Sequence, residues 1–293
     1  MKGRTLKGYL FAIISAVIYG CMPLMAKLIY ADGVNPMSLV FLRNALALPS
    51  LAILALTQQK TLKVPLKILP SIGLLSFFGC TLTPILLFSS YNYIASGTAT
   101  IFHFIYPAVI VVAGILFLKK KEPVSNIISV FLCFAGVALF YDPAEPLNLT
   151  GCAFALGSGI TFATYVMLLP RFSTGNITGF LFSFYVALGS SISAFILCIA
   201  TGSLTLPATA LGWGLCLLFA VAVTSGAVVL FQQGAFIIGA EKTAILSTLE
   251  PITGVVIGIL VFHESVQPGT VIGCILVISA SLLIALADLK KPQ

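Results

Sequence analysis

Long apolar runs alternate with short polar stretches along the whole chain. Each run is about 20 residues long, which is the length that a helix needs to cross the hydrocarbon layer of a membrane. Because this layer holds no water to satisfy backbone N–H and C=O groups, such a run has to be helical. The ten predicted spans are residues 8–30, 36–57, 68–90, 95–118, 124–141, 151–169, 179–201, 210–235, 241–262 and 268–287. The pattern therefore predicts an all-α integral membrane protein with ten transmembrane helices.

The composition leaves little chain for a soluble domain, since 59% of the residues are hydrophobic and only 8% are charged. A net charge of +7 would suggest nucleic acid as the partner of a soluble protein, but here it reports orientation. Thirteen of the 15 Lys and Arg residues fall on one side of the predicted membrane: Lys2, Arg4, Lys7, Lys60, Lys63, Lys67, Lys119, Lys120, Lys121, Arg171, Lys242, Lys290 and Lys291. The opposite loops carry Asp32, Asp142, Glu145 and Glu264. We expect a multi-pass protein of the plasma membrane with both termini in the cytoplasm and no nucleic-acid partner.

The two halves of the chain resemble each other. The segment that begins Tyr106-Pro107 matches the segment that begins Glu250-Pro251 at an offset of 144 residues, and a polar turn and a last apolar run follow each. The sequence therefore predicts two five-helix repeats, at residues 8–141 and 151–287. Because five is odd, the second repeat starts on the opposite side of the membrane and is inverted. Inverted repeats recur in secondary transporters, whose substrate site lies near the midplane between them.

Four motifs carry a resemblance to a known family. They are Tyr19-Gly20 before Lys27, Phe41-Leu42-Arg43-Asn44, the segment from Tyr91 to Gly97 before Pro107, and Leu249-Glu250-Pro251 before His263-Glu264. In their order, spacing and duplication the chain resembles the ten-helix EamA-type exporters of the drug/metabolite transporter superfamily. The resemblance covers essentially the whole chain, as two EamA-like domains. It implies export of a small organic solute from a prokaryotic cell.

Four ionisable residues fall inside predicted spans, where a charge costs about 2.5 to 3.5 kcal/mol and normally faces a cavity or a partner. They are Lys27, Arg43, His103 and Glu250. Lys27 is about one turn from the outer end of its helix, so its amine can alternatively reach the lipid headgroups. Arg43 lies roughly 10 Å deep at 1.5 Å per residue, which favours a position facing a cavity.

Polar residues share one face of the ninth predicted span, where Ser247, Glu250 and Gly254 recur at helical spacing. The repeat offset sets His103 of the fourth span opposite Ser247, and Tyr106 opposite Glu250. We expect both faces to look into the bundle. The alternative is that these side chains only let helices approach closely and hydrogen-bond.

These groups suggest a substrate site. Arg43, alone or with Lys27, would attract a carboxylate, while Glu250 would accept an amine or be neutralised by Arg43. A zwitterion such as an amino acid suits both charges. The candidate substrate-binding residues are Tyr19, Lys27, Arg43, His103, Tyr106, Tyr165 and Glu250. The three tyrosines would line an amphipathic pocket, although aromatic side chains in a bundle also serve as packing. Glu250 and His103 are also candidates for proton coupling, because a carboxyl and an imidazole both exchange protons.

Several prolines fall within the predicted spans, where each removes a backbone hydrogen bond and can kink its helix. These candidate hinges are Pro23, Pro49, Pro84, Pro107 and Pro251. The pairs Gly254/Gly258 and Gly269/Gly273 have the spacing of close helix contacts in membranes, which leaves a homodimer open.

The seven cysteines are scattered along the spans without C-x-x-C spacing, which indicates packing residues rather than disulfides or metal ligands. The sequence contains no G-x-S-x-G, no H-E-x-x-H and no Gly-rich phosphate loop with Lys. We therefore expect no catalytic site, no cofactor and no metal.

The sequence thus predicts a secondary transporter that moves a small organic metabolite, amino acid-like or drug-like, across the cytoplasmic membrane as an exporter, by alternating access. Its predicted partners are that small-molecule substrate and the lipid bilayer. The alternatives are a uniporter or exchanger that imports a metabolite, and a channel. A channel would be expected to carry a selectivity filter or a ring of charges, and the sequence shows neither.

Overall fold

The computed structural model describes residues 2–59, 61–119, 123–139, 148–168, 179–238, 243, 246–247, 249–263 and 268–289. Within these residues all regular structure is helical. Seven helices are long and apolar enough to cross a membrane: Thr5–Ala31, Pro36–Gln58, Leu66–Ser90, Ser96–Phe117, Leu149–Leu168, Gly179–Ala200 and Ala210–Phe231. Shorter apolar helices occupy Val124–Ala138, Leu249–Phe262 and Val271–Ala280. The predicted all-α membrane fold is confirmed for this part of the chain, whereas ten crossings and inverted repeats stay predictions.

Part of the sequence prediction falls outside the described residues. This holds for Lys60, Lys120, Lys121, Arg171, Lys242, Lys290, Lys291, Asp142, Glu145 and Glu264, and for most of the start of the ninth span. The orientation that these charges indicate therefore stays a prediction.

The first span consists of two helices, α1 (Lys2–Gly20) and α2 (Met22–Ala31), which meet at Cys21. Pro23 lies in the first turn of α2, where its missing N–H costs no helical hydrogen bond. The end of α1 crosses α14 (Leu249–Phe262) at very short range. A Cβ added to Gly20 would lie 2.4 Å from Cβ of Thr253, so only glycine fits there.

The third and eighth spans are each interrupted by a π-helical segment. In the third span η1 (Leu66–Ile68) and α4 (Leu69–Leu75) lead into the π-helical η2 (Ser76–Leu82) and then α5 (Thr83–Ser90). In the eighth, α11 (Ala210–Phe219) leads into the π-helical η4 (Ala220–Ala227) and then α12 (Val228–Ile238). The two segments begin at Ser76 and Ala220, which are separated by the repeat offset of 144 residues.

The fourth span is broken as well, between α6 (Ser96–His103) and α7 (Tyr106–Leu118). In the ninth span α14 begins at Leu249, directly after a turn at Ser247. The remaining spans are single continuous helices, namely α3 (Pro36–Gln59), α8 (Val124–Ala138), α9 (Leu149–Leu168), α10 (Gly179–Ala200) and α15 (Pro268–Leu289). Pro49 lies inside α3 without ending it.

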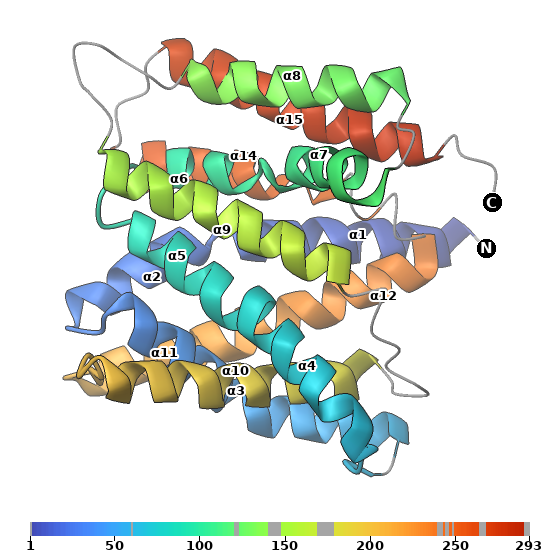
Figure 1. Ribbon diagram of the computed structural model, residues 1–293. Coiled ribbons are helices and arrows are strands. Elements are labelled where there is room, and N and C mark those ends of the chain that lie inside the picture. The colour runs from blue at the N-terminus through green and yellow to red at the C-terminus, as the bar shows by residue number, and fades with distance from the viewer. Residues whose placement is uncertain are drawn as a thin grey trace.

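Four of the continuous helices form the two edges of the bundle. Figure 1 shows α8 beside α15 at one edge and α3 beside α10 at the opposite edge, in agreement with their contacts. Between these pairs lie α1, α5, α6, α9, α12 and α14, which contact one another. The beginning of α1 and the end of α15 lie on the same side of the bundle (Figure 1).

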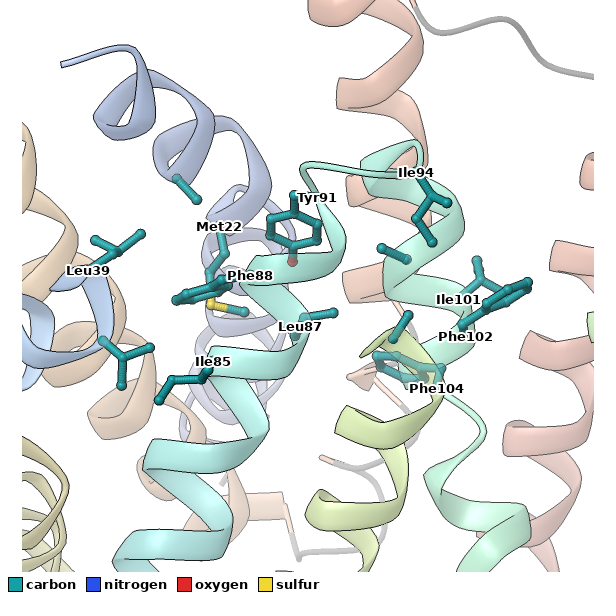
Figure 2. Close-up of a cluster of buried hydrophobic side chains, with 14 of the residues drawn as sticks. Met22, Leu39, Ile85, Leu87, Phe88, Tyr91, Ile94, Ile101, Phe102 and Phe104 are labelled. Carbon is teal, nitrogen blue, oxygen red and sulfur yellow. The ribbon is translucent and has the colours of Figure 1, made fainter. Parts of the chain in front are cut away.

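The main apolar core fills the space between α2, α3, α5 and α6. Figure 2 shows Met22, Leu39 and Phe88 gathered on one side of this core, and Ile101 and Phe102 of α6 on the other. Many large apolar side chains point outward instead, such as Phe131 of α8, which is 72% exposed. An apolar outer surface is what a lipid-facing bundle requires.

Two loops on one side of the bundle are joined by hydrogen bonds. Asp32, after α2, accepts hydrogen bonds from the hydroxyl of Thr209 at 2.8 Å and from its backbone N–H at 3.1 Å. Thr209 caps α11 by accepting the N–H of Gly212 at 3.0 Å. The N–H of Asn35 donates to Oγ1 of Thr205 at 2.8 Å. These contacts tie the α2/α3 loop to the α10/α11 loop.

Candidate binding site

Arg43 of α3 is a half-buried cation in the bundle interior. Its Nε is inaccessible to solvent and has no hydrogen-bond partner among the described residues. The guanidinium carbon lies 5.6 Å from the ring centroid of Phe88 and 5.8 Å from that of Phe219. Both distances are within the range of cation–π attraction, so the two rings partly stabilise the charge.

Neutral groups surround this guanidinium. Tyr19, Cys80 and Tyr91 are near enough to interact with it electrostatically. Within the part of the chain that the structure describes, Arg43 forms no ion pair with Glu250. The half-buried guanidinium, whose Nε is buried and unpaired, therefore has no described carboxylate at ion-pair distance, and an anionic ligand would supply one.

Glu250 lies in the first turn of α14, directly after the break in the ninth span. The partial positive charge of a helix N-terminus favours a carboxylate at this position. Its carboxyl interacts electrostatically with Tyr19, Tyr91 and Tyr106. Tyr19 and Tyr91 also interact with Arg43, so each of these two hydroxyl groups is within electrostatic range of both opposite charges.

Tyr91 is held in place by Thr100 of α6, whose side chain hydrogen-bonds to its hydroxyl. Thr100 in turn donates to the carbonyl oxygen of Ser96 at 2.9 Å. A Cβ built on Gly254 would sit only 3.6 Å from Oγ1 of Thr100, so α14 passes directly over this group. The hydrogen bond with Thr100 thus positions Tyr91, which was not among the candidate residues chosen from the sequence.

Aromatic rings extend the site toward α9. The rings of Tyr106 and Phe162 pack edge to face with centroids 4.9 Å apart, and Phe162 lies 5.8 Å from Tyr165. Gly79 of η2 makes room for Tyr165, because a Cβ at this glycine would lie 2.4 Å from the tyrosine ring. Tyr106 and Tyr165 thus belong to one amphipathic wall.

His103 is buried at the end of α6 and directed toward α9. Ser158 donates its hydroxyl hydrogen to the carbonyl of Ala155 at 2.6 Å, so its oxygen accepts from Nδ1 of His103 at 2.9 Å. The imidazole also packs 5.4 Å from the ring of Phe162 and 5.9 Å from that of Tyr106. This residue therefore borders the aromatic wall and not the Arg43 guanidinium.

Lys27 lies away from Arg43 and Glu250. Its ammonium lies 4.1 Å from the ring centroid of Phe262, the last residue of α14. Phe262 follows Glu250 by about 18 Å along the helix axis at 1.5 Å per residue. The structure thus gathers Tyr19, Arg43 and Glu250, joins Tyr106, Tyr165 and His103 to them through rings, and leaves Lys27 near the helix end.

Several residues near the guanidinium escaped the sequence analysis, namely Cys80, Phe88, Tyr91 and Phe219. Only Tyr91 had a signal, since it opens one of the four motifs. The seven cysteines are free thiols and five of them are buried, as their packing role predicts, but Cys80 is partly exposed next to Arg43. No group of three His, Cys, Asp or Glu side chains able to hold a metal occurs among the described residues.

A comparison with family models decides the family. The model of the EamA-like transporter family matches residues 6–141 and, separately, residues 149–286. The chain belongs to the EamA-like transporter family. The resemblance drawn from the four motifs is thereby confirmed, and this EamA-like protein is a multi-pass membrane protein of a transporter family.

Curated relatives of the EamA-like chain carry only general names. An uncharacterized transporter of Haemophilus influenzae is 29% identical over 188 residues, which cover 60% of this chain and 61% of that protein. An uncharacterized transporter of Clostridium kluyveri is 23% identical over 302 residues, covering 94% of this chain and 92% of that protein. These names support transport of a small solute across a membrane.

One solved crystal structure resembles the EamA-like fold with a TM-score of 0.67, over 97% of this chain and 99% of that chain. The two sequences are 13% identical, so the likeness shows the fold alone.

Proposed function

We propose that this EamA-like protein is a secondary transporter that exports a small organic solute carrying a carboxylate from the cytoplasm by alternating access. The observation that carries the proposal is the half-buried Arg43, whose buried Nε has no hydrogen-bond partner among the described residues. A buried cation without a counterion is costly, and a substrate carboxylate would remove that cost while gaining a charge-assisted hydrogen bond. The same residue therefore selects for an anionic group.

The second charge narrows the substrate. Glu250 shares the electrostatic neighbours Tyr19 and Tyr91 with Arg43 and suits an amine at the other end of the same solute. A zwitterion would neutralise both charges at once, and the ring wall of Tyr106, Phe162 and Tyr165 would contact its apolar part. We infer an amino acid-like substrate.

The architecture proposed for this cycle consists of ten crossings arranged as two inverted five-helix repeats, at residues 8–141 and 151–287. Two separate family matches, two π-helical segments at the repeat offset, and the beginning of α1 and end of α15 on the same side support this arrangement. An even number of crossings returns the chain to the side on which it started. The excess of basic residues supports a cytoplasmic location of that side, and the plasma membrane is the location that we propose for the protein.

Metabolite profiling of the medium around overproducing cells tests the proposal. We expect a carboxylate-bearing solute to accumulate with the wild type, and Arg43→Gln to reduce its accumulation about tenfold or more, because a lost charge-assisted bond costs about 1.5 to 3 kcal/mol. Glu250→Gln should also reduce it. Lys27→Gln, which removes a cation that lies away from Arg43, is the matched control and should export normally.

Two results would contradict the proposal. One is an unchanged medium relative to cells with an empty vector, and the other is full export by Arg43→Gln at equal membrane levels. Proton coupling through Glu250, with His103 as the second candidate, belongs to the same proposal, and efflux that ignores an imposed pH gradient would exclude it.

A further inference from the structure

The two π-helical segments occupy matching places in the chain. η2 interrupts the third span and η4 interrupts the eighth, and they begin 144 residues apart at Ser76 and Ala220. Each borders the candidate site, because Cys80 of η2 interacts with Arg43, and Phe219, whose ring lies over Arg43, directly precedes η4. A π-helical turn has weaker backbone hydrogen bonding than an α-helical one and is common at functional positions.

A proline in the first turn of α5, just after η2, leaves one backbone carbonyl of η2 without its helical hydrogen-bond donor. Pro84 has no N–H for the carbonyl of Cys80, four residues earlier. The hydroxyl of Ser190 on α10 donates to that oxygen at 2.7 Å. Thr81 lies 2.9 Å from the Ser190 hydroxyl and 2.7 Å from that of Ser193. Side chains of the edge helix α10 thus replace the missing backbone contact.

Hydroxyl groups also hold η4, although this segment contains no proline. Oγ of Ser225 in η4 lies 2.7 Å from Oγ of Ser50 on the edge helix α3. The hydroxyl of Ser15 on α1 donates to the carbonyl of Ala227 at 2.8 Å. Each π-helical segment is therefore fastened by hydroxyl groups to an edge helix that belongs to the other half of the chain.

We propose that η2 and η4 are the two bending points of the carrier, and that the contacts Thr81–Ser193 and Ser225–Ser50 hold them in the arrangement seen here. The edge helices α3 and α10 stay fixed, and access to Arg43 changes sides when a segment slides against its edge helix. Hydroxyl groups suit this role because they can exchange partners at small cost, unlike interlocked apolar side chains. The inference rests on the proposed alternating access.

Disulfide locking tests the inference without any knowledge of the substrate. Ser50→Cys/Ser225→Cys joins η4 to α3 when oxidised. The matched control is Ser38→Cys, which pairs with the native Cys198 and joins α3 to α10, since Oγ of Ser38 lies 4.0 Å from Sγ of Cys198.

The readout is modification of Cys80, in the opposite half of the chain, by the membrane-impermeant anionic reagent sulfonatoethyl methanethiosulfonate. Whole cells offer the outer face to the reagent, inverted vesicles offer the cytoplasmic face, and mass spectrometry of the Cys80 peptide gives the extent.

We expect Cys80 to be modified from both faces in the wild type and in the oxidised control. In oxidised Ser50→Cys/Ser225→Cys, modification from one face should fall at least tenfold, and prior reduction of the same protein should restore it. Unchanged modification from both faces in the oxidised variant would overturn the bending role while leaving alternating access intact. Modification of the wild type from one face only would overturn alternating access, and the bending points with it.

Discussion

At the scale of single residues, Arg43 is the most unusual group in the protein. Taking a charge out of water costs several kcal/mol, and two cation–π contacts return about 0.5 to 2 kcal/mol each. The remaining cost is tolerable in a folded protein only if function needs the charge. An anionic ligand would remove the unfavourable free energy of the unpaired positive charge. The affinity should therefore depend on the anionic group of the ligand more than on its contact area.

Gly20 offers a test of how tightly the site helices are packed. In a helix with open space, Gly→Ala stabilises by about 0.5 to 1 kcal/mol, as expected for Gly73, which has nothing within 4 Å of its added Cβ. At Gly20 the same methyl group would lie 2.4 Å from Thr253, and overpacking costs about 1 to 3 kcal/mol. Thermal unfolding followed by circular dichroism should therefore show a lower midpoint for Gly20→Ala than for Gly73→Ala. Equal midpoints would mean that α1 and α14 separate easily.

Residues of the site were predictable where they broke the apolar pattern. Arg43 and Glu250 stand out because charged residues are rare in apolar runs. Phe and Cys residues also occur elsewhere in the apolar spans. A single sequence therefore does not distinguish Phe88, Phe219 and Cys80 from residues that only pack. The position of Lys27 was harder to predict, because a charged side chain near a helix end can face either a cavity or the lipid headgroups.

At the scale of secondary structure, the interruptions were only partly predictable. Pro23, Pro84 and Pro107 each lie in the first turn of a new helix, where the sequence suggested hinges. Pro49 lies inside a continuous α3, and η4 contains no proline. A π-helical turn depends on contacts with neighbouring helices, such as Ser50 with Ser225, which local sequence does not reveal.

The loop contact at Asp32 makes a prediction about pH. Hydrogen bonds from the side chain and backbone of Thr209 lower the pKa of this carboxyl, which lies beyond the end of the first span, from its ordinary value of 3.8. Because the folded-state pKa is the lower one, the stabilising contribution is complete well above 3.8 and is lost as the pH falls through the folded-state value. The midpoint of thermal unfolding should therefore be higher for wild type than for Asp32→Asn at pH 6, and the difference should shrink toward pH 3. A difference that is constant with pH would show that the carboxylate charge is not involved.

At the scale of the whole molecule, the all-α membrane class and the positions of the described helices were predicted from the spacing of apolar runs. The family was predicted from the order of the motifs. The sequence did not predict that α3 with α10 and α8 with α15 would form the edges, because packing partners depend on three-dimensional contacts. That all four edge helices are continuous, while most inner spans are interrupted and, of those described, only α9 is not, appears only in the structure.

Reporter fusions test the proposed orientation. Green fluorescent protein placed after Gln293 should fluoresce, because it folds in the cytoplasm, and alkaline phosphatase at the same place should be inactive. Alkaline phosphatase fused after Gly202, in the loop that contacts Asp32, should be active because that loop lies on the outer side in the proposed topology. Phosphatase activity at the C-terminus would reverse the assignment.

The π-helical segments also mean that the third and eighth spans each carry about one residue more than an α-helix of the same rise. In an α-helix each residue turns the chain by about 100°, so removing one residue from η2 would rotate everything after it by that amount. The shortened third span would still be apolar and long enough for the membrane. Its outer half, however, would present Phe88 and Tyr91 to different neighbours. A single-residue deletion that hydropathy alone would call harmless is thus expected to dismantle the surroundings of Arg43.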